Sequence, residues 1–409
     1  MGKGPWYSIN EVFAKGNEMI TRSYLMVAFA ALPAILQAQF SSGSTGSDGP
    51  LNLTASGTVI LDPSTLPNKC ANNVCNFTSI NIAANTVVVL TSQLWRNASV
   101  VWLSQGDVTI AGTLHADGQN GATMNPSNPG LNRFPAAPGP GGFPGGVGGY
   151  LGQPAQPGGG FGGGAAGSSA GVNGQNGTYS YYNNQLTPLI GGSGGGGGYQ
   201  GTSLAGGNGG GGGGAIRIVS TTSITVNGLI TAEGGASTCS VGGGNGGCAG
   251  YGSGGIIHLI APTVAGSGSL NTYSGVSGIT EISAATNSFA TRLIVGNFVI
   301  AGLYAPPLPT GLPTVTVTSV NNVAAPQYPQ ANPMTPDVTI NSSTPVTVAI
   351  ATQNIPTTAT PTLYLTSENA PDSVATCALV NGTVASATWT CTAANFPSGI
   401  TITNILAVW

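Results

Sequence analysis

Charged side chains are scarce in this chain. They make up 5% of 409 residues, against about a quarter in an ordinary soluble domain. No lysine follows Lys69. Binding of nucleic acids needs clustered lysine and arginine to contact the phosphates, so the composition argues against a nucleic-acid partner. Low charge also removes the repulsion that keeps proteins apart, and we therefore expect the chain to associate with itself.

Catalytic and ligand-binding motifs are missing as well. The chain has no GK[ST] phosphate loop, and its GxGxxG and GxSxG matches arise by chance in glycine-rich tracts. No aspartate lies between Asp117 and Asp337, which excludes the calcium-binding GGxGxD repeat. We therefore expect no cofactor, no metal site and no enzymatic activity.

The N-terminus has the pattern of a secretion signal. Lys15 and Arg22 precede the apolar run 24–36, and a cleavage site of small residues lies near Ala38. The run is shorter than the roughly 20 apolar residues of a transmembrane helix. The pattern predicts a cleaved signal peptide at 1–38, a disordered Gly/Ser-rich leader at 39–50, and a secreted, extracellular or cell-surface protein.

The cysteines fall into three close pairs. In a secreted chain an even number of locally paired cysteines indicates disulfides that close loops. The alternative, a zinc site, needs CxxC spacing with histidine nearby, and neither histidine of the chain is so placed. The predicted disulfides are Cys70–Cys75, Cys239–Cys248 and Cys377–Cys391.

Two near-copies of one pattern organise residues 51–303. VTIAGTLHADG at 108–118 and ITVNGLITAEG at 224–234 align without a gap, and a weaker third version lies at 254–272. Short strands with glycine kinks, repeated as a unit, predict a parallel β-solenoid. We expect each acidic residue to cap a turn, with the glycine after it at positive φ. The repeat-turn residues are Gly112, Asp117, Gly118, Gly228, Glu233 and Gly234.

A glycine-rich insertion at 118–214 separates the first two copies. Its segment 139–214 holds 34 of the 67 glycines. One interpretation is a flexible linker, because ordering glycine costs the most entropy. The other is an ordered bundle of polyglycine-II-like strands with three residues per turn, on which aromatic residues pack. These aromatic residues are Tyr179, Tyr181, Tyr182 and Tyr199.

The C-terminal part changes to an antiparallel pattern. YAPPLPTGLP at 304–313 predicts a stiff proline-rich linker. Seven alternating segments over 314–409 predict an immunoglobulin-like β-sandwich, with Cys377 and Cys391 flanking a hairpin. The expected strands are TVTVTSV, DVTIN, PVTVAIAT, TLYLTS, ATCALV, ASATWTCTA and TITNILAVW.

A resemblance to a known group follows from these segments. GGAIRIVS and ITVNGLITAEGG, with GGIIHLIAPT after them, resemble the glycine-rich, right-handed β-helix proteins that some bacteria secrete. The C-terminal part is similar to sandwich modules of bacterial surface proteins. The resemblance implies an all-β fold and an extracellular location, but no particular activity.

Right-handed β-helices also include pectate lyases and polygalacturonases, so polysaccharide cleavage is a rival. Such enzymes need clustered carboxylates. Asp117 and Glu233 occupy equivalent repeat positions and are either a carboxylate pair or two turn caps. The other acidic residues of the predicted solenoid past residue 100 are Asp107 and Glu281.

Two histidines and two tryptophans complete the candidates. His115 and His258 lie at alternating strand positions, and each is either a general base or a residue of the solenoid wall. Arg217 is in register with His258, which places both on an outward-facing line. Trp95 and Trp102 are either sugar-binding platforms or core residues.

The sequence therefore favours a secreted structural or adhesive protein that assembles with itself into a fibre or matrix. The alternative is a surface protein that binds or cleaves polysaccharide. A weaker third hypothesis is ice or surface binding by ordered glycine strands and rows of threonine.

Overall fold

The structure is a computed structural model of the chain. It describes residues 40–123, 133–150, 152–169, 172–178, Leu186, 188–201, 205–240, 246–304, 313–326, 336–341, 345–367, 373–393, Phe396, Gly399 and 401–407. The predicted signal peptide, Tyr179, Tyr181 and Tyr182 lie outside these residues. Over the described ranges, no helix is long and apolar enough to cross a membrane.

The described part of the chain is all-β, as expected. Its helical pieces are short 3-10 turns at Pro63–Thr65, Ala71–Asn73 and Thr291–Leu293. The buried apolar side chains form two separate clusters, one in the parallel strands before residue 302 and one in the antiparallel strands after residue 313. The change from parallel to antiparallel pairing therefore coincides with a change of core.

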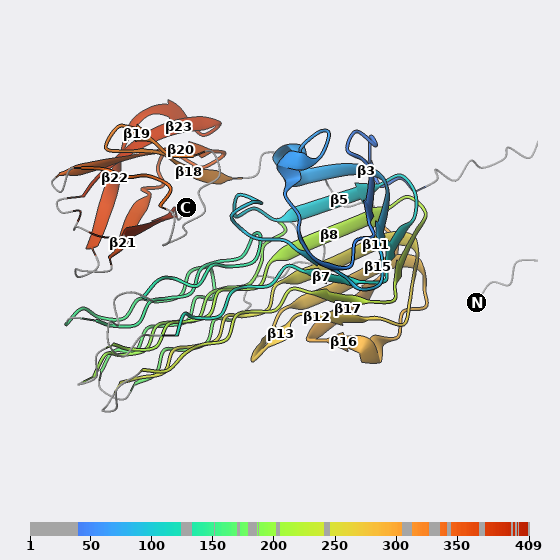
Figure 1. The fold of residues 1–409 in the computed structure, drawn as a ribbon, viewed down its shortest axis with the longest axis horizontal. Coiled ribbons are helices and arrows are strands. Elements are labelled where there is room, and N and C mark those ends of the chain that lie inside the picture. The colour runs from blue at the N-terminus through green and yellow to red at the C-terminus, as the bar shows by residue number, and fades with distance from the viewer. Residues whose placement is uncertain are drawn as a thin grey trace, which may run out of the picture. The chain divides into compact units, whose positions relative to one another are not determined.

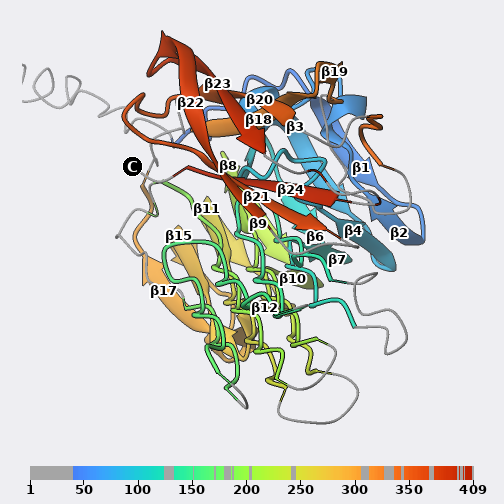
Figure 2. The same cartoon turned by 90° about the vertical axis from the view of Figure 1, so that its left-hand side faces the viewer.

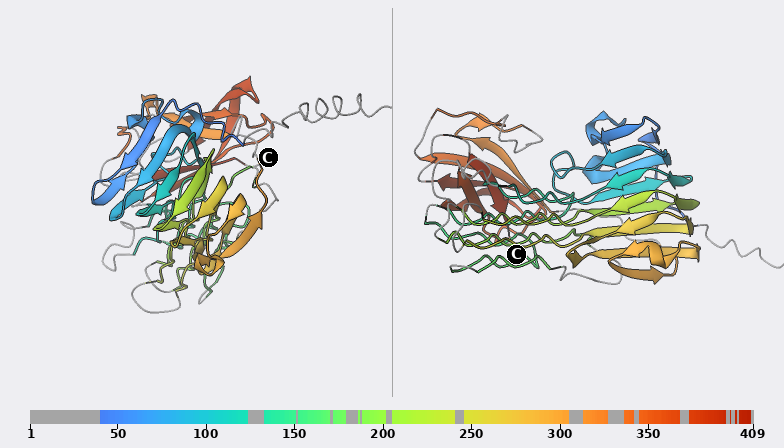
Figure 3. Two further views of the ribbon diagram at one scale, coloured as in Figure 1. Left: turned by 90° about the vertical axis from the view of Figure 1, so that its right-hand side faces the viewer. Right: turned by 60° about the horizontal axis from the view of Figure 1, so that its bottom comes forward.

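The strands of the first cluster pair in parallel and stack in chain order (Figure 3, right), and their pairing registers divide them into three columns. Three long strands each contribute to columns 1 and 2, namely β3 (Val74–Ile82), β11 (Ile256–Ala265) and β15 (Ile279–Asn287). Column 1 also contains β5 (Val100–Ser104), β8 (Ala215–Ser220) and β17 (Asn297–Ala301). Column 2 also contains β1 (Gly49–Leu53), β6 (Val108–Ile110) and β9 (Ser223–Val226). Column 3 contains β2 (Gly57–Ile60), β4 (Thr86–Val89), β7 (Thr113–His115), β10 (Leu229–Thr231), β12 (Ser269–Asn271) and β16 (Ile294–Val295).

The near-copies of the sequence are neighbours in these columns. Val108 pairs with Ile224 in column 2, and Leu114 pairs with Ile230 in column 3. Both pairs have the same offset, since 224 − 108 and 230 − 114 are both 116. A slip of one residue would turn every side chain to the other face, so this constant offset fixes which residues point inward.

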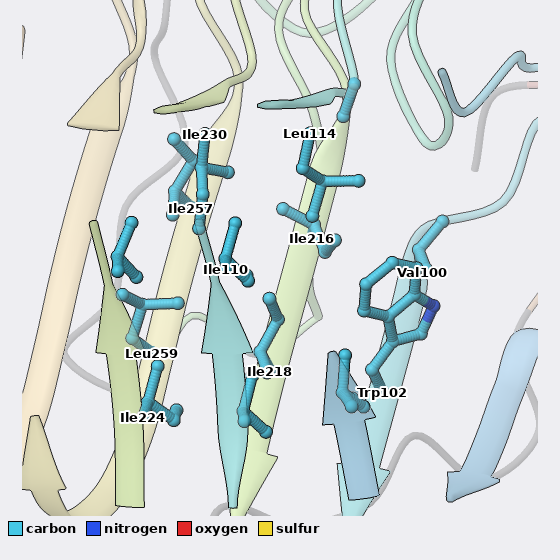
Figure 4. Close-up of a cluster of buried hydrophobic side chains, with 14 of the residues drawn as sticks. Val100, Trp102, Ile110, Leu114, Ile216, Ile218, Ile224, Ile230, Ile257 and Leu259 are labelled. Carbon is cyan, nitrogen blue, oxygen red and sulfur yellow. The ribbon is translucent and has the colours of Figure 1, made fainter. Parts of the chain in front are cut away.

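Inward-pointing residues form continuous apolar ladders (Figure 4). In column 1, Trp102, Ile218 and Leu259 are paired partners in successive strands, and all are fully buried. Side chains two apart on a strand share a face, which explains the alternation in the sequence. Burying one such aliphatic side chain contributes about 1.5–3 kcal/mol.

The predicted disordered leader is wrong from Phe40 onward. The Ser42 hydroxyl donates to the Ser104 carbonyl (2.7 Å), and the Ser44 hydroxyl donates to the Phe77 carbonyl (2.7 Å). The buried Asp48 carboxylate accepts from the backbone N–H of Asn76 (2.7 Å). Short polar side chains therefore hold this segment against the bends between columns 1 and 2.

The glycine-rich insertion is ordered wherever the structure describes it. Its extended runs, which we call rods, leave the strand columns on one side and lie side by side (Figures 1 and 2). Gly192, Gly195 and Gly198 donate backbone hydrogen bonds to the carbonyls of residues 213, 210 and 207, at 2.7, 2.9 and 2.9 Å. A period of three is that of a helix with three residues per turn. The polyglycine-II interpretation has this hydrogen-bond pattern in its favour.

The rod at 191–199 lies at the centre of this bundle. Its residues 191–198 are all buried. Backbone hydrogen bonds join it to six neighbouring runs, at 141–149, 156–159, 164–167, 172–175, 207–213 and 247–253. A Cβ atom on Gly195 would collide with the carbonyl oxygen of Gly250, and one on Gly196 with that of Ala165. Glycine is required at these two positions because the backbone of neighbouring runs leaves no room for a Cβ atom.

The expectation of positive φ at Gly118 and Gly234, the glycines that follow Asp117 and Glu233, is wrong. Gly112, Gly118, Gly228 and Gly234 all lie outside the positive-φ region. A Cβ atom would instead meet backbone of the neighbouring turn: the Thr86 oxygen at Gly112, the Gly211 oxygen at Gly118, the Gly112 oxygen at Gly228 and the Gly252 oxygen at Gly234. Close stacking of successive turns, rather than backbone conformation, excludes a side chain here.

The C-terminal residues form an antiparallel sheet in the order β19-β18-β20-β23-β22-β21-β24. Residues 337–341, expected as a strand, are not in one, and β19 was not expected. Cys377 and Cys391 pair across the β22–β23 hairpin, as expected. The strands are β18 (Thr314–Val320), β19 (Val323–Ala324), β20 (Val346–Gln353), β21 (Thr362–Ser367), β22 (Ser373–Thr383), β23 (Ser386–Ala393) and β24 (Thr401–Leu406).

Candidate functional site

Column 3 ends in a polar cluster, which we call the strand-end cluster. It consists of His115, Asp117, Thr231, Glu233 and Asn271. His115, Thr231 and Asn271 are paired partners at the ends of β7, β10 and β12. Because parallel strands end at one edge of a sheet, the acidic residues that follow two of these strands reach the same place. Asp117 and Glu233 thus lie close together, as their repeat positions predict.

Asp117 joins two successive turns of the chain. Its Oδ2 lies 2.8 Å from His115 Nδ1 and accepts a hydrogen bond from the Thr231 hydroxyl at 2.8 Å. Its Oδ1 accepts from the backbone N–H of Glu233 at 2.7 Å. Asn271 in turn donates through its side-chain amide to Glu233. Both oxygens of Asp117 therefore have partners within the fold, which favours the turn-cap interpretation.

The surroundings raise the pKa of both His115 and Glu233 in this cluster. The hydrogen bond to Asp117 raises the pKa of His115, and the negative charges of Asp117 and Glu233 add to the effect. Burial and the neighbouring Asp117 raise the pKa of Glu233. The side chains of His115 and Asp117 are 32% and 29% exposed, so solvent reaches them. The cluster can bind and release a proton, although its hydrogen bonds are used internally.

A second cluster lies on the outward-facing side of column 1, which we call the buried ladder. Arg217, His258 and Glu281 are paired partners in β8, β11 and β15, so the expected register of Arg217 with His258 is confirmed. The expectation that this line faces solvent is wrong, because the three residues are 2%, 0% and 0% exposed. Tyr304, predicted to begin the linker, belongs to this cluster instead.

Hydrogen bonds connect the buried ladder along its length. Arg217 donates through Nε to His258 Nδ1 (3.1 Å) and through Nη2 to the Leu186 carbonyl (2.8 Å). The hydroxyls of Tyr304 and Ser283 each donate to Glu281 Oε1 at 3.0 Å. Glu281 Oε2 is buried and has no hydrogen-bond partner within the part of the chain that the structure describes.

Burial controls the protonation of this ladder. It lowers the pKa of His258 well below its ordinary value, and the positive charge of Arg217 adds to this effect. It raises the pKa of Glu281. The His258 imidazole is therefore neutral. Its Nδ1 accepts a hydrogen bond from Arg217, and its Nε2 lies 3.5 Å from Glu281 Oε1. These groups are sealed from solvent and serve to join three strands and Tyr304.

The remaining candidates have structural positions. Asp107 accepts hydrogen bonds from the Thr222 and Ser223 hydroxyls, which lower its pKa, at the bend between β8 and β9. Trp95 and Trp102 are fully buried, so they cannot be the sugar platforms that one interpretation required.

All three predicted disulfides are present, at Cys70–Cys75, Cys239–Cys248 and Cys377–Cys391. Disulfides are typical of an oxidising, extracellular compartment. Among the described residues, no group of acidic, histidine and cysteine side chains could hold a metal ion.

Sequence reasoning missed Thr231, Asn271, Ser283 and Tyr304. Thr231 and Asn271 had a signal, because they occupy the repeat position of His115. Tyr304 had none, since it follows the last strand of column 1 and precedes a proline-rich run.

Comparison with protein-family models, with curated proteins and with solved structures finds no match to this chain. The functional conclusion therefore depends on the residues themselves.

Proposed function

We propose that this is a secreted structural or adhesive protein of the extracellular space. It is a β-solenoid in which the three strand columns are the faces of successive coils, with a rigid polyglycine-II bundle and an immunoglobulin-like sandwich attached. The observation that carries the proposal is the rod at 191–199, which backbone hydrogen bonds join to six neighbours. Such a body is a stiff, uncharged element with the properties of a spacer or contact surface.

The two polar clusters support a structural role over catalysis. Both oxygens of Asp117 bind donors of the fold, and the buried ladder is closed to solvent. A general acid or base must reach the atom whose proton it transfers. Arg217, His258 and Glu281 of the buried ladder are closed to solvent, and the partly exposed Asp117 of the strand-end cluster uses both carboxylate oxygens within the fold, so each cluster serves to join neighbouring strands.

Low charge supports self-association. The segment after the predicted signal peptide has five basic and nine acidic residues, a net charge of 5 − 9 = −4 over 371 residues. Few like charges then oppose close contact between copies. We therefore propose that the protein works as a multi-copy assembly, in a fibre, a matrix or a surface layer.

Electron microscopy of the natively secreted protein, purified without denaturant, tests the function. Regular assemblies that contain many copies are the expected result. Sedimentation velocity over a wide range of concentrations provides the matched solution measurement. Dispersed single chains at every concentration, in both measurements, would contradict the structural role.

Polysaccharide binding is the second candidate, and two exposed tyrosines at one hairpin favour it. Tyr251 and Tyr273 are 41% and 46% exposed. The hairpin of β13 (Tyr273–Ser274) and β14 (Val276–Ser277) turns at Gly275, which lies against the Tyr251 ring. A glycan array comparing the wild type with Tyr251→Ala and Tyr273→Ala tests this candidate. Binding that both substitutions leave unchanged would remove it.

A further inference from the structure

The two ends of the stacked strands are finished differently. At the N-terminal end, the loop 61–73 covers the core, with Leu61 and Cys70 buried and the Cys70–Cys75 disulfide closing the loop. Trp95 packs there and donates to the Leu61 carbonyl at 3.2 Å. At the C-terminal end, β17 pairs with β15 on one side, and no other described strand pairs with its outer edge. Stacked repeats need a cap at each end to protect the core, and here the second cap is absent from the described residues.

The inward-facing ladders of column 1 continue into β17 and become exposed there. Ile300 is the partner of Ile282, which pairs with Leu259, and both of these are fully buried. Ile300 itself is 44% exposed. Phe298, the partner of the buried Thr280, is 48% exposed. Two large apolar side chains that point along the core direction thus lie open to solvent.

The edge also lacks the usual protection against pairing. Natural edge strands carry lysine, proline or a bulge, which prevents contact with another chain. Residues 294–301 read IVGNFVIA, without a charge or a proline, and β17 pairs with β15 in regular register. An apolar, uncharged edge without a bulge is a template for a further strand.

We propose that the β17 strands of two copies pair antiparallel about a two-fold axis at Val299. In this register Phe298 lies opposite the partner's Ile300, and Ile300 lies opposite the partner's Phe298. Val299 lies opposite the partner's Val299. The strand is therefore self-complementary, as an isologous contact requires. The two cores become continuous, and both exposed apolar side chains are covered.

A second copy in this orientation is the occupant that the fold favours. The loop at 61–73 and its disulfide cover the core at the N-terminal end. Head-to-tail stacking would therefore place this covered end against the open C-terminal end of the next copy. Back-to-back pairing instead joins two open ends. The contact rests on the proposed self-association and gives it a first step, a closed dimer from which larger assemblies form through other surfaces.

Cysteine crosslinking of the full chain tests the register. All six native cysteines are in disulfides, so a single introduced thiol is the one free thiol in the protein. Val299→Cys should form a covalent dimer under mild oxidation on a non-reducing gel, because the two thiols meet at the axis. The matched control is Ile60→Cys, which places an exposed thiol on β2 at the opposite end and should stay uncrosslinked.

Charge substitution tests the contact without crosslinking. Ile300→Lys should convert the dimer to half its mass by light scattering, with an unchanged circular dichroism spectrum. Ile60→Lys should leave the mass of the dimer unchanged. If Ile300→Lys fails to fold, Asn297→Lys on the same edge provides the same readout.

The outcomes separate this inference from the proposed function. Val299→Cys that crosslinks no more than Ile60→Cys, with assemblies still present by microscopy, would overturn the dimer and leave the structural role standing. A single chain at every concentration would overturn both. Crosslinking at Val299 with no assembly beyond two copies would support the dimer and contradict the fibre.

Discussion

The strand columns and the glycine rods solve one problem in two ways. Both are arrays of extended chain joined sideways by backbone hydrogen bonds. In the columns, side chains alternate with a period of two, so Ile218 and Leu259 fill the space between sheets. In the rods the period is three and every direction meets another rod, so backbone fills the space itself. The comparison shows that a buried core can be built without side chains.

The two cores differ in what stabilises them. Burial of apolar area stabilises the columns. The rods have little of it, while glycine loses about 0.5–1 kcal/mol more than alanine on ordering. One hydrogen bond contributes about 0.5–1.5 kcal/mol net, so a rod needs bonds on several sides. It also needs anchors: Gly214 at the end of one rod donates to the Ala116 carbonyl (2.7 Å), next to β7.

A methyl group distinguishes the two cores most sharply. Gly195→Ala puts a Cβ atom against the Gly250 carbonyl, and rigid backbone on all sides leaves no room for it. We expect a loss above about 3 kcal/mol, at the high end for overpacking. Ile218→Val removes a methyl group from the column core and should cost about 0.5–1.5 kcal/mol. Chemical unfolding of both variants measures the difference.

Gly302→Ala is the control, because no atom lies within 4 Å of its added Cβ. It should change the free energy of unfolding by less than about 0.5 kcal/mol. If Gly195→Ala is as mild as Gly302→Ala, the bundle has no rigid core.

The Cys239–Cys248 disulfide should stabilise the bundle. It closes a short loop between two rods, with a sequence separation of 9. Replacing both cysteines by serine should lower the free energy of unfolding by about 2–3 kcal/mol, because the unfolded chain gains conformational entropy when the loop is no longer closed. Thermal unfolding of the variant, followed alongside peptide-level hydrogen exchange, tests whether the loss is confined to the rods. Equal loosening of β8 and β11 would show that the bundle and the columns unfold together.

The side chain of Asn208 lies inside the bundle and forms hydrogen bonds with the backbone of neighbouring runs. Asn208 is fully buried; its Oδ1 accepts from the Gly148 N–H (3.1 Å) and its Nδ2 donates to the Ala122 carbonyl (3.0 Å). Asn208→Ala should cost about 1–2 kcal/mol, because buried groups lose their partners. Asn227→Ala, whose side chain accepts from Ser267 N–H at an exposed turn of the columns, should cost less. Equal costs would contradict a buried role for Asn208.

The smallest expected effect concerns pH and should come from the columns. The pKa of His258 is held well below about 6.5, its unfolded value. The unfolded chain therefore takes up a proton that the folded chain refuses, and stability falls as pH drops below that value. The pKa of His115 is raised, so its contribution is complete below about 6.5 and is lost as pH rises past its folded pKa.

The two histidines should thus have opposite signs. His258→Gln should reduce the loss of stability in acid, and His115→Gln should reduce the loss on the alkaline side. Urea unfolding at several pH values between about 5 and 8 measures both slopes. If both substitutions change the pH dependence of stability in the same direction, the opposite pKa shifts of His258 and His115 are wrong.

Much of the columns could be predicted from the sequence, because alternation and the repeat are local signals. Aligning VTIAGTLHADG with ITVNGLITAEG places Leu114 opposite Ile230, and these two residues are paired partners in column 3. The same reasoning aligns Arg217 with His258, which are paired partners in column 1.

Burial of the outward-facing line could not be predicted, because the residues that bond to it, at Leu186 and Tyr304, are far away in the sequence. The leader was missed for a related reason: its Ser42 and Ser44 hydroxyls bind carbonyls of distant strands. At the repeat turns, the sequence pattern identified the glycines but assigned Gly118 and Gly234 the wrong cause, since the close approach of neighbouring backbone is a property of stacking.

Amide hydrogen exchange of the rod at 191–199 measures whether the glycine-rich insertion forms a backbone core. These amides should be protected as strongly as those of β8 and β11, because each bonds to a neighbouring run inside the bundle. Exchange at the rate of an unstructured peptide would contradict this prediction, and the glycine-rich insertion would then be a flexible linker.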